Sequence, residues 1–164
     1  MRATQIEAIL TRLSQGGVEF VVIGGVAALA HGSARVTFDV DVCYRRTREN
    51  IERLCEALAS LHPTLRGAPP DLPFKFDVAT VTTGLNFTLS TDLGDLDLLG
   101  EVAGLGEYTA VQAASETLPL YGLPMRVLTL EGLLTAKRAA ARRKDEEAIV
   151  ELEALLELRK RPPE

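Results

Sequence analysis

The sequence predicts an α/β domain, with a mixed β-sheet, helices mainly on one face of that sheet and further helices at the C-terminal end. Short apolar and alternating segments indicate strands, apolar residues recur at helical spacing near both ends, and glycine or proline breaks separate the segments. The 164 residues, 46% of them hydrophobic, are enough to bury the core of one domain spanning 1–164.

The first expected elements are a helix, a buried strand and a second, short helix. Apolar residues at helical spacing lead to the Gly16-Gly17 break, namely Ile6, Ile9, Leu10 and Leu13. A strand over 18–23 follows, and Gly24-Gly25 opens a helix over 26–31 that ends at Gly32. A glycine turn before a helix suits phosphate, because glycine allows close approach and the exposed amides favour an anion. A glycine pair by itself is more often only a tight turn.

A predicted strand over 36–43 carries two aspartates on one face. Because successive side chains alternate, Val36, Phe38, Val40 and Val42 form the packing face, and Thr37, Asp39, Asp41 and Cys43 form the other. Two neighbouring carboxylates repel each other unless a cation neutralises them or one of them keeps a proton. Mg²⁺ with substrate phosphates is the simplest resolution, and such ions suit phosphoryl chemistry. The alternative is the solvated face of an edge strand.

The middle of the chain is expected to contain a helix and a long loop. Thr47 is the predicted N-cap of a helix that runs to Ser60. The proline-rich segment 62–73 is predicted to be a loop at the border of the substrate site, and a short helix is expected within 74–83.

Two hairpins and three helices complete the expected elements. Strands over 85–91 and 95–99 form an antiparallel hairpin whose second strand brings a third acid to the sheet. A short helix over 108–115 precedes a second hairpin within 118–128. Two C-terminal helices follow, with apolar stripes at Leu130, Leu133 and Leu134 and at Ile149, Leu152, Leu155 and Leu156.

The order of these motifs resembles the nucleotidyltransferase superfamily. The motifs are Gly-Gly, His-Gly, Arg-x-Thr-x-Asp-x-Asp at 35–41, a strand with Asp-Leu-Leu-Gly-Glu-Val, and helices with Lys-Arg-Ala-Ala and Arg-Lys-Asp. The resemblance covers roughly residues 18–158, the expected core of the domain. Within the superfamily, the sequence most resembles minimal nucleotidyltransferases and small bacterial proteins related to AbiEii-type toxins. It implies the polymerase-beta-like fold, an NTP substrate and Mg²⁺ as cofactor.

Several residues are candidates for binding the ligands that the resemblance implies. Asp39 and Asp41 match the acids that hold the metal ions with the triphosphate. The candidate nucleotide-binding residues are Gly24, Gly25, Arg35, Thr37 and Lys137. Arg35 could instead form a salt bridge at the rim, and Lys137 could extend its ammonium group into water.

The third acid of the superfamily matches Asp97. That acid binds metal or acts as the base for the attacking hydroxyl, and both roles suit phosphoryl transfer. Asp95 falls on the same strand face, so only the match of segment 97–101 to the family favours Asp97. Glu101 shares this face as well and is predicted to be a solvated strand end.

Charged residues outside the acidic strands have mainly structural interpretations. His31 is expected to cap the short helix at its negative end. The segment 137–144 holds five basic residues in eight, which could serve a triphosphate or an RNA end or form a solvated helix face. Arg142, Lys144 and Asp145 match a family signature, although capping of the last helix by Asp145 explains that residue equally well.

Composition limits the compartment and the partners. Cys43 and Cys55 cannot form a disulfide framework or a four-ligand zinc site, and Cys55 lies on an apolar helix stripe. No apolar span is long enough for a membrane and no leader is evident, which favours the reducing cytoplasm and excludes a membrane partner. The net charge of -5 disfavours tight nucleic-acid binding.

The predicted function is a Mg²⁺-dependent nucleotidyltransferase that moves a nucleoside monophosphate from an NTP to a hydroxyl. Its relatives imply a transfer RNA end, a cognate protein or a small antibiotic as acceptor, with a toxin–antitoxin or defence role. A non-catalytic nucleotide-binding or antitoxin-like module is the alternative, although such a module needs no converging acids. A metal-dependent phosphodiesterase is a third hypothesis.

Overall fold

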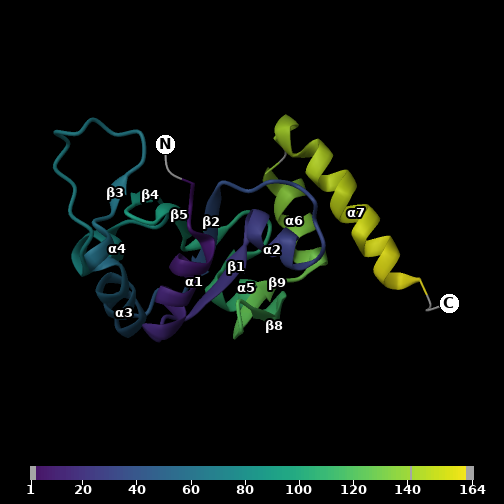
Figure 1. The fold of residues 1–164 in the computed structure, drawn as a ribbon, viewed down its shortest axis with the longest axis horizontal. Coiled ribbons are helices and arrows are strands. Elements are labelled where there is room, and N and C mark those ends of the chain that lie inside the picture. Colours follow the sequence, from purple (N-terminus) through teal and green to yellow (C-terminus); the bar gives the residue numbers. More distant parts are fainter. Residues whose placement is uncertain (1–2, 141, 162–164) are drawn as a thin grey trace.

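A seven-stranded mixed sheet organises the computed structural model, which describes residues 3–140 and 142–161 (Figure 1). The order of strands across the sheet is β3-β4-β5-β2-β1-β9-β8, and β6 and β7 form a separate pair. The strands are β1 (Phe20–Ile23), β2 (Asp39–Tyr44), β3 (Thr64–Leu65), β4 (Phe87–Thr91), β5 (Gly94–Leu99), β6 (Glu101–Val102), β7 (Gly106–Glu107), β8 (Ser115–Leu120) and β9 (Leu123–Leu128). The predicted α/β class with a mixed sheet is confirmed.

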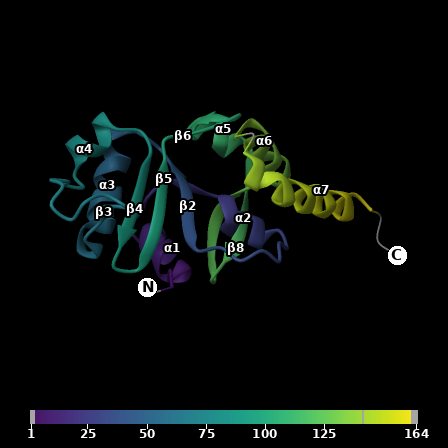
Figure 2. The same ribbon diagram turned by 90° about the horizontal axis from the view of Figure 1, so that it is seen from above.

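Helices lie at both ends of the sheet as well as against it. They are α1 (Ile6–Gln15), α2 (Gly24–Ala30), α3 (Arg48–Leu58), α4 (Val78–Thr83), α5 (Tyr108–Ala113), α6 (Leu130–Ala140) and α7 (Glu146–Lys160), with 3-10 turns η1 (Ala59–Leu61) and η2 (Arg143–Asp145). Seen from above, α3 and α4 lie beside β3 and β4, while α6 and α7 lie at the opposite end of the molecule (Figure 2). Within the described residues, every helix is too short or too polar to cross a bilayer.

The N-terminal elements follow the predicted periodicity. The stripe of α1 buries Ile9, Leu10 and Leu13 completely, and α1 packs against α3, β2 and β9. Thr47 caps α3 as predicted, because its hydroxyl accepts a hydrogen bond from the backbone N–H of Asn50 at 3.3 Å.

The centre of the sheet combines both kinds of strand pairing. β2 runs parallel to β5 and antiparallel to β1, which in turn runs parallel to β9. The aliphatic side chains of these strands are buried in the core; they include Val21, Val22, Val40, Val42, Leu96 and Leu98. The acidic side chains of β2 point to the face opposite Val40 and Val42, because the strand alternates.

The predicted strand over 36–43 begins too early. β2 starts at Asp39, and the side chains of Val36 and Phe38 are 75% and 77% exposed rather than packed. The reason is the length of the neighbouring strands. The pairing of β2 with β5 starts at the Asp39–Asp95 pair, and β1 ends opposite Asp41, so residues 36–38 have no strand beside them.

The segment predicted as the loop 62–73 contains a short strand. Thr64 and Leu65 form β3, which pairs antiparallel with β4 at the edge of the sheet. The expected helix within 74–83 is α4, whose N-cap is Asp77. Both predicted hairpins are present, as β4 with β5 and as β8 with β9.

The C-terminal helices are packed less completely than the predicted stripes suggest. In α6, Leu130, Leu133 and Leu134 are buried as expected. In α7 only Leu152 is buried, while Val150 and Leu158 are more than half exposed. α7 lies along α6 and extends away from the sheet, so one side of it faces the protein (Figure 1).

Candidate metal and nucleotide site

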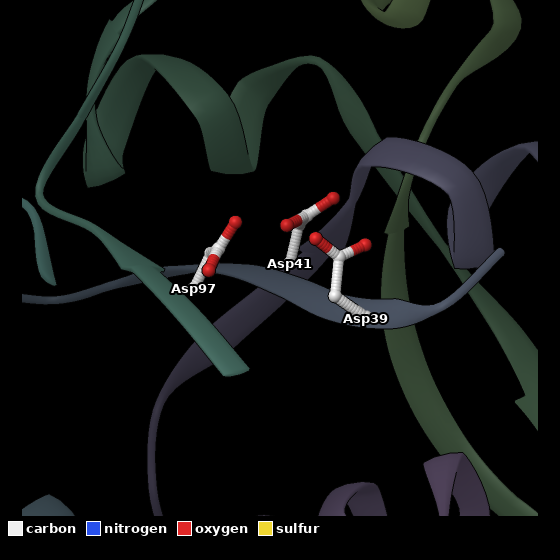
Figure 3. A group of neighbouring side chains, drawn as sticks. All are labelled: Asp39, Asp41 and Asp97. Carbon is white, nitrogen blue, oxygen red and sulfur yellow. The ribbon is translucent and has the colours of Figure 1, made fainter. Parts of the chain in front are cut away.

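Strand register brings the three predicted acids together. β2 carries Asp39 and Asp41, and the parallel pairing of β2 with β5 sets Asp41 directly beside Asp97. One carboxylate oxygen from each of the three residues lies within 4.8 Å of the others. Figure 3 shows the carboxylates pointing to the same side of the two strands.

The same register distinguishes the two candidates for the third acid. Asp95 pairs with Asp39 across the strands, but the three-acid group contains Asp97 and not Asp95. The hydroxyl of Ser90 donates a long hydrogen bond of 3.5 Å to Asp95. The choice of Asp97, which the family match alone supported, therefore agrees with the geometry.

The electrostatics of the cluster favour a bound cation. Burial, followed by the charges of Asp39 and Asp97, raises the pKa of Asp41 to about 8. Burial and the charge of Asp97 also raise the pKa of Asp39. Both shifts mean that ionisation of all three carboxyl groups is unfavourable unless a cation is bound beside them. Carboxylate oxygens are the ligands that hard divalent cations prefer, so the three acids can bind a metal.

Both glycines that open α2 lie against residues of the acidic segment. Gly24 has a φ of +64°, and a Cβ atom built on it would overlap Oδ2 of Asp41. A Cβ atom on Gly25 would lie 2.6 Å from the hydroxyl oxygen of Thr37. The glycines thus make room for the side chains of β2 and of the segment before it, a steric requirement distinct from their expected contact with nucleotide.

Arg35 and Thr37 lie in the exposed segment that leads into β2. The Thr37 hydroxyl donates to the backbone carbonyl of Asp39 at 3.1 Å, which supports the chain at the first acid. Arg35 forms an ion pair of 3.5 Å with Glu147, in which the two side chains are 45% and 88% exposed, so the pair contributes little stability.

Lys137 is held by a buried acid. Its ammonium nitrogen lies 3.1 Å from Oδ1 of Asp145, and the guanidinium of Arg142 lies 2.8 Å from Oδ2 of the same carboxylate. Burial by itself would raise the pKa of Asp145, but the hydrogen bonds from Lys137 and Arg142 outweigh it and lower that pKa. Asp145 occupies the predicted N-cap position of α7, but its side chain makes no capping hydrogen bond there and instead binds Lys137 and Arg142.

A pocket of about 710 Å³ connects the acids to these cations. It runs from the ends of β1, β2 and β5 to α6 and α7, and its volume falls in the range of small-molecule sites. Every predicted site residue lines it, namely Gly24, Gly25, Arg35, Thr37, Asp39, Asp41, Asp97 and Lys137. The lining of the pocket thus combines the three carboxylates of the cluster with the basic side chains of Arg35, Lys137, Arg142 and Lys144, and it also includes Asp145 and Glu151.

Arg66 is a residue at this site that the sequence analysis missed. One guanidinium nitrogen, Nη2, donates to Oδ1 of Asp97 at 2.8 Å and to the carbonyl of Leu89 at 2.7 Å. Its Nε lies 3.4 Å from Oδ1 of Asp95 but makes no aligned hydrogen bond. No spacing in the sequence links Arg66 to the acids, and only recognition of β3 as an edge strand beside β4 would have found it.

Other residues singled out in the sequence have structural contacts. Nε2 of His31 lies 2.8 Å from the carbonyl of Leu128, so this nitrogen carries the proton, and Nδ1 accepts a hydrogen bond of 3.1 Å from Arg159. Cys43 is fully buried, and burial raises the pKa of its thiol to about 12. Glu101 is exposed at the start of β6, as predicted.

Comparison with solved structures shows where this fold recurs. The chain is similar to the lincosamide antibiotic adenylyltransferase LnuA in its lincomycin-bound form, with a TM-score of 0.62 and 15% identity over 94% of this chain and 99% of that chain. For ANT(2")-Ia in complex with adenylyl-2"-tobramycin, the TM-score is 0.57 and the identity 15%, over 90% of this chain and 82% of the other. A nucleotidyltransferase-like protein from Paracoccidioides brasiliensis gives a TM-score of 0.56 at 15% identity, over 93% and 74%.

No protein-family model and no curated protein matches this chain in sequence. The likeness to the solved structures is therefore one of fold. All three of the structures above are nucleotidyltransferases or resemble them, and the expected AbiEii relationship is a prediction that they do not test. The protein has the polymerase-beta-like nucleotidyltransferase fold.

Proposed function

We propose that the protein is a Mg²⁺-dependent nucleotidyltransferase. The observation that carries the proposal is the convergence of Asp39, Asp41 and Asp97, with ligand oxygens within 4.8 Å of one another, in a pocket that is also lined by basic side chains. A nucleotide needs both kinds of group, because a metal held by the carboxylates would stabilise charge at the reacting phosphate and basic side chains would offset the remaining phosphate charge.

In the proposed reaction, a hydroxyl oxygen of the acceptor attacks the α-phosphorus of the NTP. The bond from that phosphorus to the bridging oxygen breaks, and pyrophosphate leaves with its electron pair. Asp39 and Asp41 would hold Mg²⁺, which would supply charge stabilisation at the phosphate oxygens. Asp97 would accept the proton of the attacking hydroxyl; if it instead serves as a further metal ligand, that proton passes to water.

The basic side chains that line the pocket have a complementary role. Lys137 lies on the lining of the pocket and also near enough to Asp41 to lower its pKa, although less than burial raises it. A compact ammonium group at this position can contact a phosphate oxygen. We assign Lys137, Arg35, Thr37 and the Gly24-Gly25 turn to nucleotide binding.

We infer that the acceptor is a small molecule with a free hydroxyl. Two of the similar structures hold a small antibiotic or its adenylylated product, and the pocket has the size of a small-molecule site. The net charge of -5 is unfavourable for a polyanionic RNA acceptor. The toxin–antitoxin setting has only the sequence resemblance as support.

We also place the protein in the cytoplasm. Cys43 and Cys55 are both free thiols, which is the usual state of cysteine in a reducing compartment. An NTP-dependent transferase needs the nucleotide pool of that same compartment.

The test is transfer of label from each α-labelled NTP, with Mg²⁺, to a panel of aminoglycosides and lincosamides, with total RNA and cell lysate in parallel. We expect the wild type to label a small hydroxylated molecule and Asp39→Asn to lose the transfer. Glu56→Gln on α3 is the matched control, since it also neutralises an acid but at an exposed position of a helix outside the pocket.

The outcomes separate the hypotheses. NTP-induced thermal stabilisation without transfer to any acceptor would favour the binding module. Breakdown of RNA without incorporation of label would favour the phosphodiesterase. Label on RNA or on a protein would support the transferase but overturn the inferred acceptor class.

A further inference from the structure

Arg66 reaches the acidic cluster from the opposite side to Lys137. It directly follows β3, and its side chain passes along β4 to β5, where Nη2 donates to Oδ1 of Asp97 at 2.8 Å. The side chain is only 27% exposed. This arginine belongs to neither the lining of the pocket nor any motif of the sequence.

The position of the guanidinium is fixed by the sheet. The backbone N–H of Arg66 donates to the carbonyl of Thr88 at 2.9 Å, and Nη2 donates to the carbonyl of Leu89 at 2.7 Å. Both acceptors belong to β4, which pairs directly with β5. Because β4 holds the guanidinium of Arg66 in place, its hydrogen bond constrains the orientation of the Asp97 carboxylate.

The charge of Arg66 also matters for the acidic site. Asp39, Asp41, Asp95 and Asp97 project from adjacent strands, in the register Asp39 beside Asp95 and Asp41 beside Asp97. Arg66 is close to the β5 pair, with Nε 3.4 Å from Asp95. Four carboxylates on one face repel one another, and a fixed cation between two of them reduces that repulsion.

We infer that Arg66 is a positioning residue of the acidic site: its guanidinium holds Oδ1 of Asp97 and thereby leaves Oδ2 oriented for the metal or for the acceptor hydroxyl. The inference rests on the proposed transferase function for its kinetic consequences, but not for its structural ones. Preorganisation of this kind affects turnover more than nucleotide affinity, since Asp97 acts at the reacting centre and the phosphates are bound elsewhere.

Three substitutions separate geometry from charge. Arg66→Lys keeps the positive charge but lacks the planar fork, and Arg66→Met removes both. Arg53→Met is the matched control, because Arg53 is an exposed arginine of α3, remote from the acids. We expect Arg66→Lys and Arg66→Met each to lower kcat by about tenfold or more while KM for the NTP changes less than about threefold. Arg53→Met should match the wild type.

A double variant tests whether Arg66 acts through Asp97. Once Asp97→Asn has removed the carboxylate, adding Arg66→Met should lower kcat by less than about twofold, because the two residues work as one unit. Multiplicative losses would overturn the inference, as would a wild-type kcat in Arg66→Lys. A loss confined to KM would also overturn it.

Thermal melting with and without Mg²⁺ tests the inference even if the protein transfers no nucleotide. Arg66→Met should melt below the wild type without the ion, and Mg²⁺ should raise its Tm by more than it raises that of the wild type, because the ion replaces the missing positive charge. Arg66→Lys should melt close to the wild type without the ion. An equal Tm deficit of Arg66→Met at all Mg²⁺ concentrations would overturn the link between Arg66 and the acids.

Discussion

Gly24 lies so close to Asp41 that a Cβ atom on this glycine would overlap Oδ2 of the carboxylate. The closeness follows from topology. β1 ends at Ile23, which pairs with Asp41 on β2, so the next residue of the chain turns directly above the acid. Gly24 is therefore explained by Asp41 and Gly25 by Thr37, apart from any contact with phosphate.

Gly24→Ala should destabilise the protein and distort the acid cluster. A non-glycine residue at a φ of +64° costs about 1–3 kcal/mol in the free energy of unfolding, and the displaced Asp41 should also weaken Mg²⁺ binding. Gly122→Ala is the matched control, because Gly122 has a φ of +77° and open space around it. Urea unfolding and the Mg²⁺-induced rise in Tm measure both effects. Identical behaviour of the two variants would contradict the steric role.

Stability without metal should fall as the pH rises from about 4 to 8. The pKa of Asp41 is raised from 3.8 to about 8 by burial and by the neighbouring acids, so the folded state binds more protons than the unfolded state in this range. Urea unfolding between pH 5 and 9 should show this slope, and Asp41→Asn should flatten it. A slope unchanged in Asp41→Asn would show that other groups cause it.

Mg²⁺ binding should have the opposite pH dependence. Because the metal needs the ionised carboxylate, its affinity should fall by about tenfold for each pH unit below the pKa of Asp41 if one proton is displaced. Calorimetric titration with Mg²⁺ at pH 6, 7, 8 and 9 measures this. A pH-independent affinity would mean that Mg²⁺ binding does not require Asp41 to lose a proton.

Asp97 and Asp95 should differ sharply in importance. Asp97→Asn should lower kcat by about 10²-fold or more, since it alters the acid that lies with Asp39 and Asp41. Asp95→Asn is the control on the same strand and face, and should change kcat by less than about fivefold. The measurement is the steady-state rate of label transfer. Equal losses would mean that the metal site extends to Asp95.

Lys137→Met should weaken NTP binding. Loss of an ammonium group that lines the pocket should raise KM for the NTP by about tenfold, with a smaller change in kcat. Arg138→Met is the control from the same helix, because Arg138 pairs with Glu153 and lies outside that pocket. An unchanged KM in Lys137→Met would assign this lysine to the ion pair with Asp145 alone.

Asp145 should stabilise the protein in a pH-dependent manner. Its pKa is lowered, so its contribution is present above about 3.8 and lost as the pH falls through the lower value of the folded state. At pH 7, Asp145→Asn should cost about 1–3 kcal/mol, because two cations lose a buried charged partner. The difference between variant and wild type in urea unfolding should shrink as the pH falls below 3.8. A constant difference would show that the charge of Asp145 is not what stabilises the fold.

The local elements could be predicted because their signals are local. The stripe of α1, the Thr47 cap and the hairpin of β4 and β5 depend on residues that are close in the sequence. The start of β2 could not be predicted in this way. Alternation continues through Val36 and Phe38, but a strand needs a hydrogen-bonding neighbour, and none extends that far.

The candidate site shows the same division. Asp39 and Asp41 are adjacent on one strand face by alternation alone, so the sequence by itself determined that pair and the approximate fold around it. Only the tertiary structure decided that Asp97 rather than Asp95 joins them, that Arg66 binds Asp97, and that Asp145 holds Lys137. The physical reason is that these contacts depend on register between strands and on packing between helices, which bring together residues whose separation in the chain carries no period.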